Sequence, residues 1–364
     1  MLLMNGNKPI LEFDLEDMYI HVLNNDFLPF ALKDYIQTTD PSDFKKSVRD
    51  IETLRDFFSG RMLNISRENA KILLNVLSLP QTLKTEERVK ISLMCRSLSM
   101  TDNFWTRENN ETNLTFDQVC LRKNKLSDAS YQISVLGRHI SACLDDLKSD
   151  LLTNGMFAKT WRRTNTLVEL WKTDKTIENI NARSEVQVSK ILDTTNIPHV
   201  TYRAEVQDGK YFAISQCFTN DNVSFVTAQD VRDYCDHIGT SFDKYVFHHF
   251  TTEMANMTVL DYIVANTDRH FENWGFLVDN NTNKITSFAP LFDHNQALIA
   301  DIFETDIDDL VYEPTGKSFL DSAKEALQYC NLTIDTDILP EQCKARYYNL
   351  FPLKELETDI EYTE

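Results

Sequence analysis

Two neighbouring stretches decide the fold of this chain: NTDRHFENWGF at residues 266–276 and FAPLFDHN at residues 288–295. Asn273 follows Asp268 by five positions, and Asp293 follows Asn273 by twenty. The short apolar runs between them, separated by a polar stretch, predict a hairpin. A loop, a hairpin and a second loop should therefore bring these three side chains together.

This combination of residues suits phosphoryl transfer. The reaction needs an acidic residue that orients the attacking hydroxyl, and oxygen ligands that hold Mg²⁺. Mg²⁺ takes few protein ligands, so one Asp and one Asn suffice. Asp268 taken alone could instead be a helix cap, but Asn273 and Asp293 at these spacings favour the functional interpretation. Arg269 and His270 should brace the loop.

A second group lies upstream. The run 166–172 predicts a strand that ends at Lys172, and residues 182–192 predict a helix that begins just before Glu185. A strand lysine held by a helix glutamate is the other half of a kinase-like site. A solvated lysine at a strand end, and a surface pair of Glu185 with Arg183, remain alternatives.

The two C-terminal stretches, together with LWK (170–172), RSEVQVSKILD (183–193) and IPHVTY (197–202), resemble the HipA-like serine/threonine kinases. The resemblance covers roughly residues 155–330. It implies the fold shared by protein kinases and phosphoinositide kinases, with ATP and Mg²⁺ as cofactors. It also implies a protein substrate and a restraining DNA-binding, antitoxin-like partner, as in a bacterial toxin–antitoxin pair.

The resemblance also implies residue roles. Asp268, with His270, would be catalytic, and Asn273 and Asp293 would hold Mg²⁺. The nucleotide would be bound by Lys172, Glu185, Lys159, Gln216, Cys217 and Phe218, the last three beside the adenine.

The chain departs from the family pattern at the phosphate loop. Residues 153–159 (TNGMFAK) hold a single glycine, and the whole chain has eight. His294, not glycine, follows Asp293. Some relatives silence themselves by phosphorylating this loop, and Thr153 or Thr160 could serve here. For His294 and Asn295, a place beside the site and a place at the core edge remain equal alternatives.

The predicted fold class is α+β. A kinase-like core would have a sheet-containing lobe at 126–245 and a helical lobe at 246–364. Residues 1–125 read as a mostly helical extension without the β-rich opening segment of the best-known relatives. Val48, Ile51, Leu54 and Phe58 at helical spacing support this interpretation.

Composition excludes several classes of function. The net charge is −19, which disfavours direct contact with nucleic acid or anionic membranes. Seven scattered cysteines without a C-x-x-C pair argue against a disulfide framework or a zinc site. No signal peptide or 18-residue apolar stretch is present, so we expect a cytoplasmic protein without a membrane span.

Two alternatives to a protein kinase stay open. D-R-H-x-x-N also resembles the loop of phosphoinositide kinases, so the acceptor could be a lipid or a small molecule, although no basic run faces a membrane. The thin phosphate loop could instead indicate a pseudokinase that binds nucleotide, or a scaffold.

Overall fold

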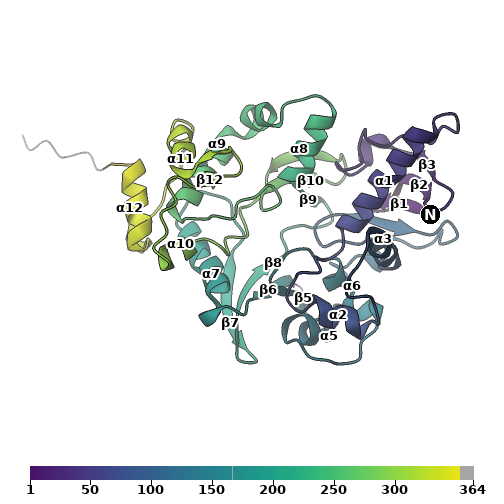
Figure 1. Ribbon diagram of the computed structural model, residues 1–364, viewed down its shortest axis with the longest axis horizontal. Coiled ribbons are helices and arrows are strands. Elements are labelled where there is room, and N and C mark those ends of the chain that lie inside the picture. The colour runs from purple at the N-terminus through teal and green to yellow at the C-terminus, as the bar shows by residue number, and fades with distance from the viewer. Residues whose placement is uncertain (166, 353–364) are drawn as a thin grey trace, which may run out of the picture.

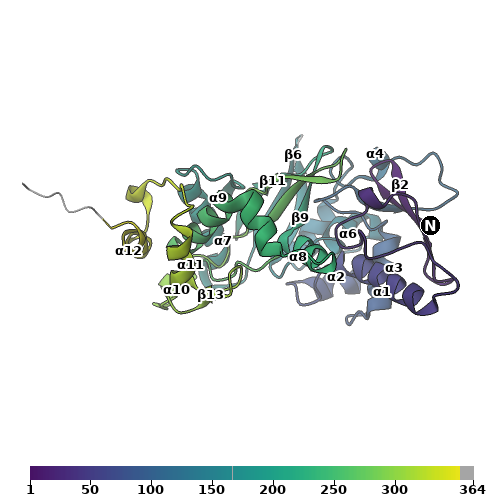
Figure 2. The same ribbon diagram turned by 90° about the horizontal axis from the view of Figure 1, so that it is seen from above.

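The computed structural model describes residues 1–165 and 167–352. Its elements are spread along one long axis, with the N-terminal strands at one end and helix α12 (Glu341–Leu350) at the other (Figures 1 and 2). The fold is α+β, with two lobes and an N-terminal region. Thr166, the first residue of a predicted strand, and the last twelve residues of the predicted helical lobe lie outside the described residues.

The N-terminal region opens with a sheet that the sequence interpretation missed. Its four antiparallel strands have the order β3-β2-β1-β4. The strands are β1 (Leu2–Asn5), β2 (Lys8–Asp14), β3 (Tyr19–Val22) and β4 (Phe104–Arg107). The helices of the region are α1 (Phe44–Gly60), α2 (Ala70–Val76), α3 (Thr85–Met94) and α4 (Phe116–Val119), after the 3₁₀ turn η1 (Asn25–Phe27). The expectation that this region lacks a β-rich opening segment is therefore wrong.

Strand alternation gives this sheet two buried faces. Neighbouring residues of β1 point to opposite sides, so Leu3 joins the core under α1 and Met4 joins the core under α2. The predicted stripe of α1 is present, because Ile51, Leu54 and Phe58 are all buried against the first of these cores. The side chain of Asp43 caps the helix by accepting from the Lys46 N–H.

Residues 128–151 belong as much to the N-terminal region as to the lobe that follows. They form α5 (Asp128–Ser130), the π-helical turn η2 (Tyr131–Val135) and α6 (Leu144–Leu151). Ile133 and Leu147 pack in the N-terminal core, whereas Tyr131 and Val135 cover the next sheet. The boundary predicted at residue 125 is therefore too early.

The first lobe is built on a four-stranded antiparallel sheet of order β5-β6-β8-β7. Its elements are β5 (Ala158–Thr164), β6 (Leu167–Thr173), the 3₁₀ turn η3 (Ile177–Asn179), α7 (Ile180–Leu192), β7 (Tyr202–Gln207) and β8 (Lys210–Gln216). The predicted strand–helix–strand–strand order is present, with β5 added before it. Asp208 and Gly209, both at positive φ, make the predicted turn between β7 and β8.

The second lobe is mostly helical and holds the largest core. Its sheet has the order β11-β10-β9. It comprises β9 (Val223–Thr227), α8 (Ala228–His237), α9 (Phe242–Ile263), β10 (Gly275–Asp279), β11 (Lys284–Phe288), α10 (Ile299–Ile302), β12 (Val311–Tyr312), β13 (Lys317–Ser318), α11 (Phe319–Ala326), η4 (Thr336–Ile338) and α12. Because β9 pairs with β10 and α8 packs in this core, the boundary predicted at residue 245 is too late.

The N-terminal region contacts the second lobe and the segment that joins the two lobes. Tyr35 stacks on His237 of α8 with ring centroids 3.8 Å apart, and its hydroxyl donates to the Asp233 carbonyl at 2.6 Å. In the connecting segment, the Thr219 hydroxyl donates to the Met100 carbonyl at 2.6 Å. Across residues 1–165 and 167–352, no helix has both the length and the apolar composition that a membrane span requires.

Candidate active site

A buried lysine joins the two lobes. Lys172, on β6, donates to Glu185 Oε1 of α7 at 2.7 Å and to Asp293 Oδ1 of the second lobe at 3.0 Å. Burial would lower the pKa of Lys172, but the two carboxylates outweigh it and hold this pKa well above its ordinary value. Burial would likewise raise the pKa of Asp293, but Lys172 first and Lys159 next hold it below its usual range. Burial raises the pKa of Glu185, and the charge of Lys172 opposes that rise.

A second lysine lies directly across the sheet. Lys159 on β5 is the register partner of Lys172, and its side chain is buried. Its ammonium donates no hydrogen bond within the part of the chain that the structure describes. Burial, with Lys172 as the next cause, lowers the pKa of Lys159 to about 8. Because two like charges opposite each other destabilise a sheet, this pair is suited to receive an anion.

The loop before β5 covers this lysine. Gly155 has φ +106°, and a Cβ there would lie 2.0 Å from the Lys159 Nζ. The backbone conformation favours glycine here, and a side chain at this position would displace the Lys159 ammonium. Thr160, a candidate for self-phosphorylation, is fully buried and donates to Asp150 Oδ1 at 3.1 Å, so its hydroxyl is inaccessible in this conformation.

The loop after α9 carries Asp268, His270 and Asn273. The Asn273 amide donates to the Asp268 carbonyl at 2.8 Å, which fixes the loop and turns the amide oxygen away from that bond. The Asp268 carboxylate remains accessible. Partial burial raises its pKa, and His270 is the largest opposing influence. The His270 Nδ1 accepts from the Glu272 N–H at 3.2 Å.

Arg269 braces the loop of Asp268, as the sequence predicted, through one carboxylate and two backbone carbonyls. Its Nε donates to Asp261 Oδ2 at 2.9 Å, and both side chains are fully buried. Its NH1 donates to the carbonyls of Asn273 and Phe292, at 2.6 and 2.9 Å. The Tyr312 hydroxyl donates to the same Asp261 oxygen at 2.9 Å. One buried cation therefore ties the loop of Asp268 to the segment that carries Asp293.

The donor set fits a magnesium ion. Asp293 Oδ1 accepts from Lys172, whereas no group among the described residues donates to Asp293 Oδ2 or to Asn273 Oδ1. Residues 1–165 and 167–352 contain no cluster of three or more His, Cys, Asp or Glu side chains suited to a metal. One carboxylate and one amide oxygen nevertheless match Mg²⁺, which keeps several waters and binds substrate phosphates.

The adenine end of the site lies where β8 leaves the sheet. The Cys217 N–H donates to the Val168 carbonyl at 2.8 Å, so this amide is already used. The next residue, Phe218, makes no backbone hydrogen bond within the described parts of the chain. Its ring packs on those of Phe225 and Phe292, with centroids 5.7 and 5.8 Å apart. An apolar surface beside a free peptide edge suits a purine base.

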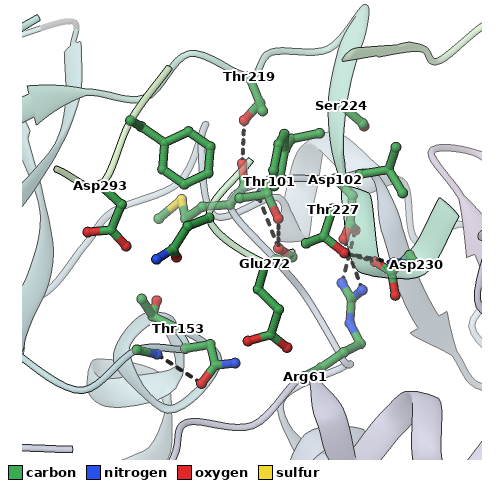
Figure 3. Close-up of a pocket in the computed structure, with 18 of the residues that line it drawn as sticks. Arg61, Thr101, Asp102, Thr153, Thr219, Ser224, Thr227, Asp230, Glu272 and Asp293 are labelled. Carbon is green, nitrogen blue, oxygen red and sulfur yellow. Dashed lines mark hydrogen bonds and ion pairs between the residues drawn. The ribbon is translucent and has the colours of Figure 1, made fainter. Parts of the chain in front are cut away.

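One cavity of about 790 Å³ joins these parts. Figure 3 shows Asp293 on one side of it, Glu272 near its centre, and Arg61, Asp102 and Asp230 on the other side. The sequence-predicted residues that line it are Lys159, Lys172, Gln216, Cys217, Phe218, Asp268, His270, Asn273 and Asp293. Glu185 lies behind Lys172. The wall from the N-terminal region was not foreseen.

Known proteins resemble this chain in part of its sequence and in its fold. Residues 153–308, fewer than half of the chain, match the family model described as phosphatidylinositol 3- and 4-kinase. HipA in the Shewanella oneidensis MR-1 toxin–antitoxin complex of HipA, HipB and operator DNA is 12% identical, with a TM-score of 0.52. The match covers 96% of this chain and 97% of that one.

The proinflammatory kinase CtkA of Helicobacter pylori is 16% identical with a TM-score of 0.40, over 54% of this chain and 87% of that one. No curated protein matches the chain. The likeness to HipA over nearly the full length of both chains shows that this chain has a HipA-like kinase fold.

Proposed function

We propose that the chain is an ATP- and Mg²⁺-dependent phosphotransferase that acts on serine or threonine hydroxyls of a protein. One observation carries the proposal. A lysine held by Glu185, and a loop that presents Asp268 and Asn273, face one cavity together with Asp293. These are the parts that phosphoryl transfer requires of a protein.

The adenine would lie against Phe218 and Phe292, with its edge on the free N–H and carbonyl of Phe218. The phosphates would then reach Lys172 and Lys159 on the sheet above. Gly155 leaves room for the Lys159 ammonium, which replaces the backbone donors of a glycine-rich loop. Lys159 and Lys172 would balance the negative charge of the triphosphate.

Asp293 Oδ2 and Asn273 Oδ1 would hold Mg²⁺, which when bound neutralises charge on the phosphates. Asp268 would accept a hydrogen bond from the acceptor hydroxyl and so orient it. The hydroxyl oxygen forms a bond to the γ-phosphorus, the bond from that phosphorus to the β–γ bridging oxygen breaks, and the hydroxyl proton passes to Asp268. ADP leaves with the bridging oxygen.

The charge on the acceptor side favours a protein over an anionic lipid. Glu272, Asp230 and Asp56 line the cavity beyond Asp268. Arg61 lies there too, but it donates to both Asp102 oxygens at 2.9 Å and is neutralised. A phosphoinositide headgroup would meet these carboxylates with negative charge of its own.

The proposed partner is a DNA-binding protein that restrains the kinase. HipA from Shewanella oneidensis is found with HipB and operator DNA. The net charge of −19 on this chain suits a protein that leaves contact with DNA to its partner. The chain alone should leave duplex DNA unretarded on a gel, and co-expression with the protein encoded beside it should yield a complex that retards it. Retardation by the chain alone would contradict this proposal.

The deciding experiment is transfer from γ-labelled ATP with Mg²⁺, followed by phosphosite mapping. Wild type should transfer phosphate to itself or to a protein acceptor, and Asp268→Ala and Asp293→Ala should not. Asp309→Ala, at an exposed position away from the cavity, is the matched control and should behave as wild type. Nucleotide binding without any transfer, with and without the co-expressed partner, would favour a pseudokinase. Transfer by Asp268→Ala at the wild-type rate would refute the assigned roles.

A further inference from the structure

Asn295 lies two residues after Asp293 and touches it. Its amide nitrogen donates to Asp293 Oδ1 at 2.6 Å, and its side chain is buried at the edge of the cavity. The orientation of the amide is fixed by chemistry, because an ionised carboxylate only accepts and the NH₂ group only donates. Asn295 therefore acts on the carboxylate proposed to hold the cation.

The two oxygens of the Asp293 carboxylate therefore differ in their hydrogen bonds. Oδ1 accepts from Asn295 and, at 3.0 Å, from Lys172, so both of its lone pairs are used. Oδ2 accepts from no group within residues 1–165 and 167–352. With Oδ1 pinned, the carboxylate cannot rotate without breaking a hydrogen bond, and Oδ2 is left for a ligand.

The backbone of Asn295 is itself held by α7. The Asn181 amide donates to the Asn295 carbonyl at 3.1 Å, and the Ser184 hydroxyl donates to the His294 carbonyl at 3.0 Å. Glu185, which holds Lys172, follows Ser184 on the same helix. Helix α7 thus positions both donors to Asp293 Oδ1. It holds Lys172 through Glu185, and it holds Asn295 through the carbonyl of that residue.

One polar atom of Asn295 is unexplained by the fold. Its amide oxygen is buried and has no donor among the described residues. A buried acceptor without a partner is unfavourable, and native structures rarely keep one without a reason. We infer that Asn295 is a positioning residue of the metal site, which fixes Asp293 so that Oδ2 faces the cation, and whose own oxygen is satisfied by a donor that arrives with the ligand. This inference rests on the proposed function.

The test is cation binding, measured without phosphoryl transfer. Free Mn²⁺ is quantified by electron paramagnetic resonance during titration of the full chain with a non-hydrolysable ATP analogue. Loss of a hydrogen-bonding partner of a metal ligand weakens metal affinity by roughly 10- to 100-fold, and we expect this for Asn295→Ala. Asn64→Ala, an exposed amide that lines the same cavity on the N-terminal side, should bind Mn²⁺ as wild type does.

Asn295→Asp separates positioning from direct ligation and keeps the packing. A carboxylate at this position cannot donate to Asp293 and repels it, so positioning predicts weaker Mn²⁺ binding. Mn²⁺ affinity equal to or tighter than wild type in Asn295→Asp, unchanged affinity in Asn295→Ala, or loss of the fold in both variants would each overturn the inference. A wild type that transfers phosphate while Asn295→Ala binds Mn²⁺ normally refutes only the inference. A wild type without transfer whose Mn²⁺ binding still needs Asn295 refutes only the proposed function.

Discussion

The buried pair of Asp261 and Arg269 gives the sharpest prediction about stability. Asp261 accepts from Arg269, from the Tyr312 hydroxyl and from the Asn266 amide at 3.0 Å, and its side chain has no exposure. Asp261→Ala leaves the guanidinium buried without its carboxylate, which typically destabilises a protein by about 3–5 kcal/mol. Tyr312→Phe removes one donor from the same carboxylate and should cost about 1.5–3 kcal/mol, because the bond is to a charged group. Urea unfolding followed by tryptophan fluorescence measures both changes.

A double substitution separates stability from loop positioning. Asp261→Leu with Arg269→Met replaces the buried pair by apolar side chains of similar volume, which is often neutral or stabilising. It still removes the donor that ties Asn273 and Phe292 together and leaves the Tyr312 hydroxyl without its acceptor. The variant should therefore lose less stability than Asp261→Ala and transfer phosphate poorly. Wild-type transfer by the double variant, or a loss below about 1 kcal/mol in Asp261→Ala, would refute this account of the network.

Three further predictions concern the cavity. Gly155→Ala and Gly209→Ala both place alanine at positive φ and should each lose about 1 kcal/mol of stability; only Gly155→Ala displaces the Lys159 ammonium, so calorimetry should show weaker nucleotide binding for it alone. The pKa of Lys159 is about 8, so its cation is present below pH 8 and is lost above it; nucleotide affinity should fall as pH rises through 8, with proton uptake on binding at pH 9 that Lys159→Arg abolishes. Glu272→Lys should weaken the binding of a basic acceptor peptide and raise its KM, while the KM for ATP stays unchanged. The exposed α9 variant Glu253→Lys should change neither KM value.

The parts of the site that lie close together in sequence could be predicted, because the types of the residues and their spacing can be read from one short stretch. The spacing of Asp268, Asn273 and Asp293 depends on one loop and one hairpin, and the structure brings all three to one cavity. Lys172 and Glu185 also meet as expected, since a strand and the helix after it pack together.

The missed parts depend on contacts between distant segments. Strand β4 pairs with β1 across about a hundred residues, and no local pattern specifies such a pairing. Gly6 and Asn7, the two residues of the turn between β1 and β2, did carry a hairpin signal. Asp261 was hidden inside an apolar helical stripe, although a single acid in such a stripe eight residues before an arginine is itself a sign of a buried pair.

The backbone near the site is strained at residues that are not glycine. Asp293 has φ +60°, Ala265 has φ +51° and Leu298 has φ +63°, a region that residues with a side chain rarely adopt. Such positions cost about 1–3 kcal/mol each and persist only where the surroundings over-determine them. Here they do, because the Leu298 N–H donates to the Val264 carbonyl at 2.8 Å, which joins the end of α9 to the loop after Asp293. Arg269 also joins these two segments, through the carbonyls of Asn273 and Phe292. The loop of Asp268 and the loop of Asp293 are thus fixed to each other by the hydrogen bond between Leu298 and Val264 and by Arg269. A substitution that removes either link should therefore increase the distance between Asp268 and Asp293.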